Sequence, residues 1–252
     1  MRLLKSAVLG FAVVATIAAQ APDALLSDTR LTVHTLVRED VFAGFRGDNV
    51  ERLERAERNI EILLKERPDD RGNLLAWKAG AATYRAVRAH EAGKAEEFGH
   101  RYKEALDGFA AAEKAVDNGG RAIIGVASIT GGTMAVFADR LPETERAAAW
   151  ALAYANYSKL WQLQGSGIEK LPVHHKGEVL SGLTQSAQRT GRTAEVAQYL
   201  DTMLSVLVDT PYEAMAKQWK ADPASAATTN LTCKNCHAPG RLANRLEALK
   251  QF

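Results

Sequence analysis

The residues best suited to chemistry stand near the end of the chain, in the run Cys233-Lys234-Asn235-Cys236-His237. The chain has two cysteines, and both belong to this run. A deprotonated thiol is a nucleophile and a soft metal ligand, and a neutral imidazole is a common ligand of transition metals. Two thiols three residues apart, followed directly by an imidazole, therefore suit covalent attachment of a cofactor, metal binding or a redox pair.

The spacing C-x-x-C-H is the pattern by which c-type haem is attached to proteins. Cys233 and Cys236 can reach the two vinyl groups on one edge of a porphyrin and form thioethers. His237 is then held beneath the iron as its proximal ligand. The sequence therefore predicts one covalently attached haem c on these three residues, and a covalent tether allows a short tail to hold the cofactor.

Three other uses of the cysteines explain the pattern less well. A zinc site needs four ligands, and only Cys233, Cys236 and His237 lie close together, so a distant histidine would have to complete it. A thioredoxin-like redox pair needs a βαβ setting, which the sequence does not show. A disulfide between these cysteines would close so small a loop that it would stabilise the fold only weakly.

The first 21 residues have the organisation of a secretory signal peptide. Arg2 and Lys5 precede an apolar run from Ala7 to Ala19, and a small-x-small cleavage site ends at Ala21. The apolar run is shorter than the roughly twenty residues that cross a bilayer comfortably. We therefore expect export to the periplasm.

The cleavage site has one unfavourable feature, since Pro22 would follow the cut bond and hinder the peptidase. Cleavage after Ala18 and an uncleaved N-terminal membrane anchor both stay open. Export agrees with haem attachment, which takes place outside the bacterial inner membrane in the c-type cytochromes that the motif resembles. The later apolar windows are interrupted by charges, so we expect no other membrane span.

The charge balance argues against a nucleic-acid partner. Lys plus Arg number 32 and Asp plus Glu number 30, and removing Arg2 and Lys5 with the signal leaves 30 of each sign. Nucleic-acid binding needs clustered cations that displace counterions, and the sequence has no basic block.

The long region before the cysteines must position them, and its pattern is helical. Apolar residues recur at helical spacing, and breaks at Gly47, Pro68, Pro142 and Gly191 divide the region into pairs. Two amphipathic helices joined by a short turn pack antiparallel. The sequence therefore predicts an all-α fold with four helical hairpins: 33–45 with 50–64, 74–99 with 100–116, 122–140 with 143–163, and 177–190 with 193–208.

Part of this region resembles a tetratricopeptide repeat. The run from Trp77 to Tyr84 has the spacing W-x-x-G-A-x-x-Y of a first helix, and the run from Ala105 to Ala112 has the A-x-x-x-F-x-x-A spacing of a second. Tyr84 and Ala105 are 21 residues apart, so the helices are longer than in the standard repeat. The resemblance covers residues 28 to 210 and implies a solenoid of helical hairpins with a concave, partner-binding face.

The haem segment is predicted to follow a linker. Residues 221–232 are rich in alanine, serine and threonine, which is typical of a connecting segment. Pro239 and Gly240 break the chain after the motif, and residues 241–250 form a short helix that can cover one side of the porphyrin. We expect three parts: the signal peptide (1–21), the tetratricopeptide-like helical domain (22–220), and the linker with the haem-binding segment (221–252).

The iron of a histidine-bound haem commonly takes imidazole or thioether as its second axial ligand. His174 and His175 follow Pro172, and we expect them in a loop between hairpins, where no helical period accounts for them. Met215 is the nearest candidate in sequence, in a short helix before the linker. We rank His174 or His175 first, Met215 second and an open five-coordinate iron third. The other histidines of the helical region are expected at the surface or paired with neighbours: His34, His90 and His100.

Two classes of function fit these features. In the first, the protein transfers electrons through its haem while the helical array docks a protein redox partner. In the second, it is a binding or assembly module in which the haem is a sensor or a structural element. No hydrolase triad, zinc-protease, P-loop or dinucleotide motif is present, so we predict no catalytic residue. A haem enzyme such as a peroxidase is a third possibility, but it needs an open iron site and distal acid–base groups that the sequence does not place.

Overall fold

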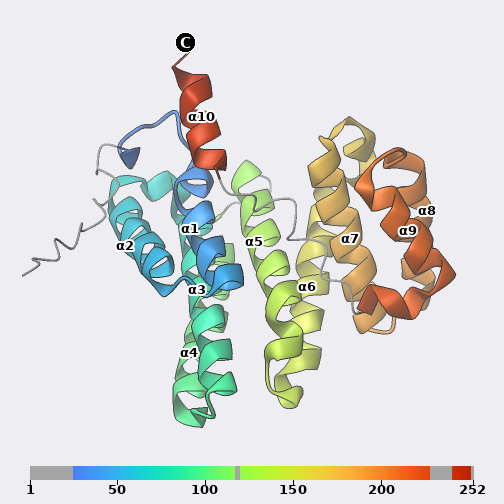
Figure 1. Cartoon of the computed structure of the whole chain (residues 1–252), viewed down its shortest axis with the longest axis horizontal. Helices are drawn as coiled ribbons and strands as arrows, with labels where there is room; N and C mark the ends of the chain where they lie inside the picture. The colour runs from blue at the N-terminus through green and yellow to red at the C-terminus, as the bar shows by residue number, and fades with distance from the viewer. Residues whose placement is uncertain (1–24, 117–119, 228–239, 251–252) are drawn as a thin grey trace, which may run out of the picture.

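The computed structural model describes residues 25–116, 120–227 and 240–250 of the 252-residue chain. All regular secondary structure in these ranges is helical (Figure 1), which confirms the all-α prediction. The α-helices are α1 (Val33–Gly47), α2 (Val50–Glu66), α3 (Arg71–Glu91), α4 (Ala95–Lys114), α5 (Arg121–Phe137), α6 (Glu143–Gln164), α7 (Val173–Arg189), α8 (Thr193–Val206), α9 (Pro211–Ala221) and α10 (Arg241–Leu249). Short 3₁₀ turns η2 (Pro68–Asp70), η3 (Ala138–Arg140), η4 (Gly165–Lys170) and η5 (Pro223–Ala227) connect some of them.

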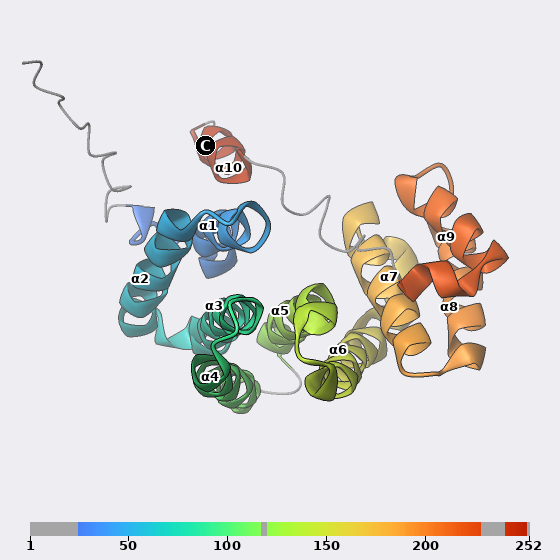
Figure 2. The same ribbon diagram turned by 60° about the horizontal axis from the view of Figure 1, so that its bottom comes forward.

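Consecutive helices pack as pairs along most of the chain. Helix α1 packs on α2, α3 on α4, α5 on α6 and α7 on α8, and successive pairs contact one another through α2 and α3, α3 and α5, and α6 and α7. Figures 1 and 2 show these pairs side by side, with the colour running from blue to orange across the molecule. Helix α10 departs from this order, because it lies beside α1 (Figure 1).

The predicted pairs agree with the structure in their order and nearly in their bounds. The largest difference lies between α3 and α4, where the sequence pattern placed the break at Gly99 and the structure places it at Gly93. Gly93 has a φ of +72°, a left-handed conformation that glycine adopts without steric cost and that commonly ends a helix. Gly99 is exposed inside α4, where a glycine weakens a helix without ending it.

The pairs share one hydrophobic core. The ring of Phe45 on α1 stacks on Tyr84 of α3 at 5.7 Å and meets Phe137 of α5 edge-on at 5.0 Å. Helix α7 approaches α6 so closely that a Cβ on Gly182 would lie 2.2 Å from the ring of Tyr157. Contacts of this kind between neighbouring pairs hold the array as one packed body.

The segment expected to be a linker is packed at its beginning. Turn η5 contacts α7 and α9, and Ala226 within it is fully buried. The expected signal peptide, residues 1–21, lies outside the described residues. Among the described residues, one stretch, 121–140, is long and apolar enough to span a membrane, but 61% of its most apolar window is buried inside the molecule. A core helix of a globular protein passes the same test.

Candidate functional site

The predicted haem-attachment residues, Cys233, Cys236 and His237, lie outside the described residues. The structure describes the chain on both sides of them. Before the motif, the chain is described as far as Ala227 in η5, which is packed on α7 and α9. After the motif, the description resumes at Gly240, the residue that precedes α10.

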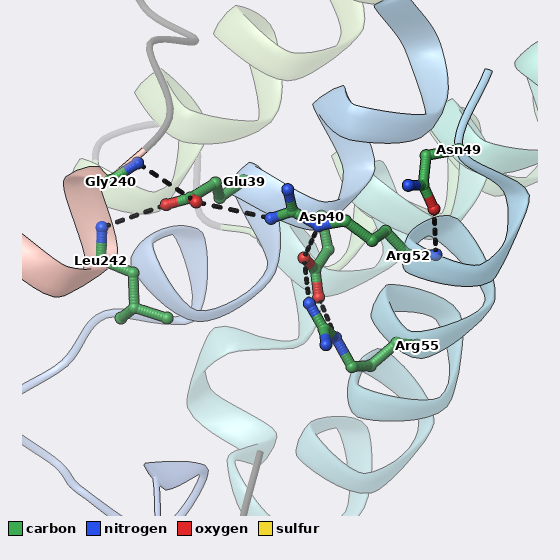
Figure 3. Close-up of polar contacts among 7 residues, drawn as sticks. All are labelled: Glu39, Asp40, Asn49, Arg52, Arg55, Gly240 and Leu242. Carbon is green, nitrogen blue, oxygen red and sulfur yellow. Dashed lines mark hydrogen bonds and ion pairs between the residues drawn. The ribbon is translucent and has the colours of Figure 1, made fainter. Parts of the chain in front are cut away.

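Glu39 on α1 holds the first turn of α10 (Figure 3). Its Oε1 accepts a hydrogen bond from the Gly240 N–H at 3.2 Å, and its Oε2 accepts one from the Leu242 N–H at 3.2 Å. The first N–H groups of a helix have no partner within the helix and carry partial positive charge. A carboxylate at this position therefore both pairs and stabilises the start of α10.

The carboxylate of Glu39 is itself part of an ionic network that joins α1 to α2. Arg52 Nη2 lies 3.4 Å from Glu39, and Arg52 Nε donates to Asp40 Oδ1 at 2.7 Å. Arg55 donates to both oxygens of Asp40, at 2.5 and 2.6 Å. The hydrogen bond with Asp40 raises the pKa of the Arg55 guanidinium. The network fixes α1, α2 and α10 relative to one another.

The C-terminal helix also contributes apolar contacts to this junction. Leu242, Leu246 and Leu249 lie along one side of α10, are half-buried and pack against the core. The expected short helix after the motif is therefore present, and it covers part of α1. Thus the chain on the C-terminal side of Cys233, Cys236 and His237 is anchored on α1, and the chain on their N-terminal side is anchored on α7.

A cleft of about 320 Å³ lies between α1, α3, α5, α6 and α7. One wall is aromatic: His34 lies 5.1 Å from Trp77 between ring centres, and Phe42 meets Trp77 edge-on at 5.8 Å. Helix α5 lines the cleft with small residues, among them Gly125 and Gly132. The cleft is therefore a mainly apolar space, and aromatic side chains of α1 and α3 form one of its walls.

The two histidines predicted as iron ligands both line this cleft. His174 and His175 lie in the first turn of α7, so the expectation that they occupy a loop is wrong. Helix α7 begins at Val173, directly after Pro172, whose fixed φ and missing N–H suit the residue before a helix. Val173 is the one apolar residue of this turn, which continues with His174, His175 and Lys176, and it is 46% exposed. The turn therefore has no apolar periodicity that could have predicted a helix.

Glu178 lies one turn after His174 and is the acidic group of the cleft. Its Oε2 is 3.7 Å from His174 Nε2, and its Oε1 accepts a hydrogen bond from Ser128 Oγ at 2.6 Å. Burial raises the pKa of the Glu178 carboxyl, while the hydrogen bond from Ser128 and the charges of His175 and Arg38 act in the opposite direction. Glu178 therefore links the histidine turn of α7 to α5.

Met215, the third predicted ligand, is placed differently. It lies in α9, is 4% exposed, and belongs to the hydrophobic core. It is not among the residues that line the cleft. The structure therefore brings His174 and His175 to the cleft and leaves Met215 in the core.

Sequence reasoning missed several residues of the cleft. His34, which was expected at the surface or paired with a neighbour, is half-buried and its ring lies against Trp77 in the cleft wall. Trp77 Nε1 and Asn73 Oδ1 are buried and have no hydrogen-bond partner among the described residues. Buried polar groups are nearly always paired with protein, water or a ligand. No local signal in the sequence marks these residues, because the cleft forms between helices that are distant in sequence.

Comparisons with protein-family models, with curated proteins and with solved structures find no match to this chain. Within the described ranges, no group of three or more His, Cys, Asp or Glu side chains is arranged to hold a metal ion.

Proposed function

We propose that the protein is an exported c-type haem protein that transfers electrons. The observation that carries this proposal is the run Cys233-Lys234-Asn235-Cys236-His237, which contains both cysteines of the chain in the haem-attachment spacing. A haem c attached there supplies one-electron transfer at its iron. Cys233 and Cys236 would hold the cofactor and His237 would be its proximal ligand.

The fold supports this proposal through the surroundings of the motif. The chain that flanks the motif is packed on α7 and on α1, and these helices contribute the histidines of the cleft: His34, His174 and His175. The residues present therefore fit a haem, since imidazole is an axial ligand and apolar walls suit the macrocycle.

The helical array would dock the redox partner. The succession of paired helices α1 to α8 supports a tetratricopeptide-like solenoid, an architecture that offers an extended binding surface. Periplasmic location follows from the predicted signal in residues 1–21. In the alternative, a binding or assembly module, the haem is structural or sensory, and the anchoring of α10 on α1 by Glu39 is the observation that favours it.

Covalent attachment is tested by mass spectrometry of protein matured in a host that attaches haem c. We expect the mass of one haem on the wild-type chain, and weaker or misplaced attachment in Cys233→Ala and Cys236→Ala. His237→Ala should retain thioethers but lose the proximal ligand, which changes the absorption spectrum. Recovery of zinc or of free thiols without haem would overturn the proposal.

Electron transfer is separated from the alternative by redox measurements on the haem-loaded protein. Reversible titration and fast electron exchange with a second cytochrome support electron transfer. A change in partner affinity when a haem ligand such as carbon monoxide is added, without such exchange, supports the sensor.

A further inference from the structure

We infer that the cleft between α1, α3, α5, α6 and α7 is a binding site for a small aromatic carboxylate. Arg38 of α1 would pair the carboxylate, and Trp77 and Phe42 would border the ring. This inference does not depend on the proposed haem attachment, because the site consists only of described residues. Three features support it: the room in the cleft, the rings in its wall and the charges that face it.

The cleft has room for one planar group of modest size. Its volume of about 320 Å³ lies at the lower end of the roughly 300–1,000 Å³ that is common for ligand pockets. Helix α5 lines this space with Gly125 and Gly132, and a Cβ placed on Gly132 would meet only the Tyr157 hydroxyl within 4 Å, at 3.7 Å. The small residues of α5 therefore leave open a space that suits a molecule of one or two rings.

Helices α1 and α3 supply the aromatic wall of the cleft. Between ring centres, Trp77 lies 5.1 Å from His34 and 5.8 Å from Phe42. His34, Arg38 and Phe42 are four residues apart along α1, so their side chains lie one above another on the same face of the helix. Trp77 therefore lies against the part of α1 that carries Arg38. Because aromatic rings pack favourably on one another in edge-on and offset arrangements, this wall favours an aromatic ligand.

Basic groups outnumber acidic ones among the described residues that line the cleft. Arg38 is a permanent cation, and Glu178 is the one acidic group of this lining. The lining also contains the imidazoles of His34, His174 and His175. Glu178 is already engaged, because its Oε1 accepts a hydrogen bond from Ser128 Oγ at 2.6 Å and its Oε2 lies 3.7 Å from His174 Nε2. A ligand that carries a negative charge therefore complements the cleft better than a cation does.

Arg38 is placed to hold the carboxylate of the ligand. Helices α1 and α7 lie on either side of α5 (Figure 2), and the charge of Arg38 acts on Glu178 of α7 across the cleft. A guanidinium has five N–H donors in a fixed fork, so it can bind a carboxylate through two of them and keep other contacts. Arg38 is half-buried, and water screens a charge less at such a position. A carboxylate bound by Arg38 leaves its ring against Trp77 and against Phe42, one turn farther along α1.

The class of ligand is tested by titration calorimetry on the full chain as the exporting host produces it. Naphthoate is the main probe, naphthamide has the same rings without the charge, and acetate has the charge without the rings. We expect naphthoate to occupy one site per chain and the other two probes to bind at least about tenfold more weakly, the effect of losing one charge-assisted hydrogen bond. Equal affinity for naphthamide, or no binding of naphthoate, overturns the inference.

Two pairs of variants locate the site, with circular dichroism as the check on folding. Arg38→Gln removes the cation of the cleft, and Arg58→Gln makes the same change at an exposed position on α2. Gly132→Leu fills the cleft, and Gly99→Leu makes the same change on α4 where a Cβ would meet open space. Only Arg38→Gln and Gly132→Leu should weaken naphthoate binding, by about tenfold or more. Unchanged affinity in these two variants, or equal losses in their controls, overturns the inference.

The same titration separates this inference from the proposed haem attachment. The haem-loaded wild type and a haem-free chain that carries Cys233→Ala and Cys236→Ala should bind naphthoate with the same affinity. If loading with haem abolishes the binding, the cofactor occupies the cleft, which overturns the inference and leaves the proposed function standing. If mass spectrometry finds no haem on a wild-type chain that binds naphthoate, the proposed function fails and the inference is supported.

Discussion

At the scale of single residues, the α1–α2 junction contains a buried carboxylate, Asp40. It is 7% exposed and receives hydrogen bonds from Arg52 and Arg55. Removing one partner of a buried ion pair leaves the other charges without compensation.

We therefore expect Asp40→Asn to lower the free energy of unfolding by about 2–3 kcal/mol, reduced from the fully buried case because the arginines reach solvent. Urea denaturation measures this change in the free energy of unfolding. Glu61→Gln is the control, since Glu61 pairs with Lys78 at an exposed site and should cost less than about 1 kcal/mol. Equal losses in both variants would show that Asp40 has no special role.

A second prediction at this scale concerns Tyr84, which donates a hydrogen bond to Asp48 Oδ1 at 2.7 Å. Burial, with this hydrogen bond, raises the pKa of Tyr84 to about 12, against about 10 in an unfolded chain. The raised pKa means that Tyr84 contributes fully to the free energy of unfolding below about pH 10, and that this contribution is lost as the pH rises toward 12. The stability difference between wild type and Tyr84→Phe should narrow across that interval in denaturation measured at each pH, and a constant difference would contradict the shift.

At the scale of elements, the docking of α10 depends on one side chain of another helix. Glu39 accepts the N–H groups of Gly240 and Leu242, and capping by a carboxylate contributes about 1 kcal/mol.

Replacing Glu39 by alanine should thus increase hydrogen exchange in residues 242–249 about fivefold, the ratio that corresponds to about 1 kcal/mol. Mass spectrometry of exchanged peptides measures this rate. Glu51→Ala on α2, an exposed site, should leave the exchange of α10 unchanged. If both variants leave it unchanged, the apolar face of α10 holds the helix without Glu39.

At the scale of the whole molecule, the helical array should fold without residues 233–252. The described part of the C-terminal segment, α10, docks on α1 at the edge of a core that continues from α1 to η5. Deleting residues 233–252 removes that docking but none of the buried residues within the array.

We expect this truncated chain to keep its helical circular dichroism, with a melting temperature lower by roughly 2–8 °C for a loss of about 1–2 kcal/mol. A chain truncated after Asp222 is the comparison, because it also loses the fully buried Ala226 and should melt lower still. Loss of helical structure on deletion of 233–252 would show that the tail is part of the core.

Much of the helical organisation could be predicted from the sequence because helices are local. Their hydrogen bonds join residues four apart, and their buried stripe repeats every three to four residues, so periodicity together with proline and glycine marks each pair. The break between α3 and α4 was predicted at Gly99 instead of Gly93 because the two glycines are close in sequence. Only Gly93 has the left-handed backbone that ends the helix. The first turn of α7 was missed because its residues carry no apolar period.

The sequence by itself determined the chemistry available, namely two thiols and an imidazole in haem-attachment spacing, and the all-helical character of the scaffold. Only the tertiary structure decided which residues of distant helices lie in contact. The cleft joins His34, Trp77, Gly132 and His174 from four helices, and Glu39 binds a turn 201 residues away. Such contacts depend on how complementary helix surfaces pack across the whole chain, and no local spacing of residues encodes that complementarity.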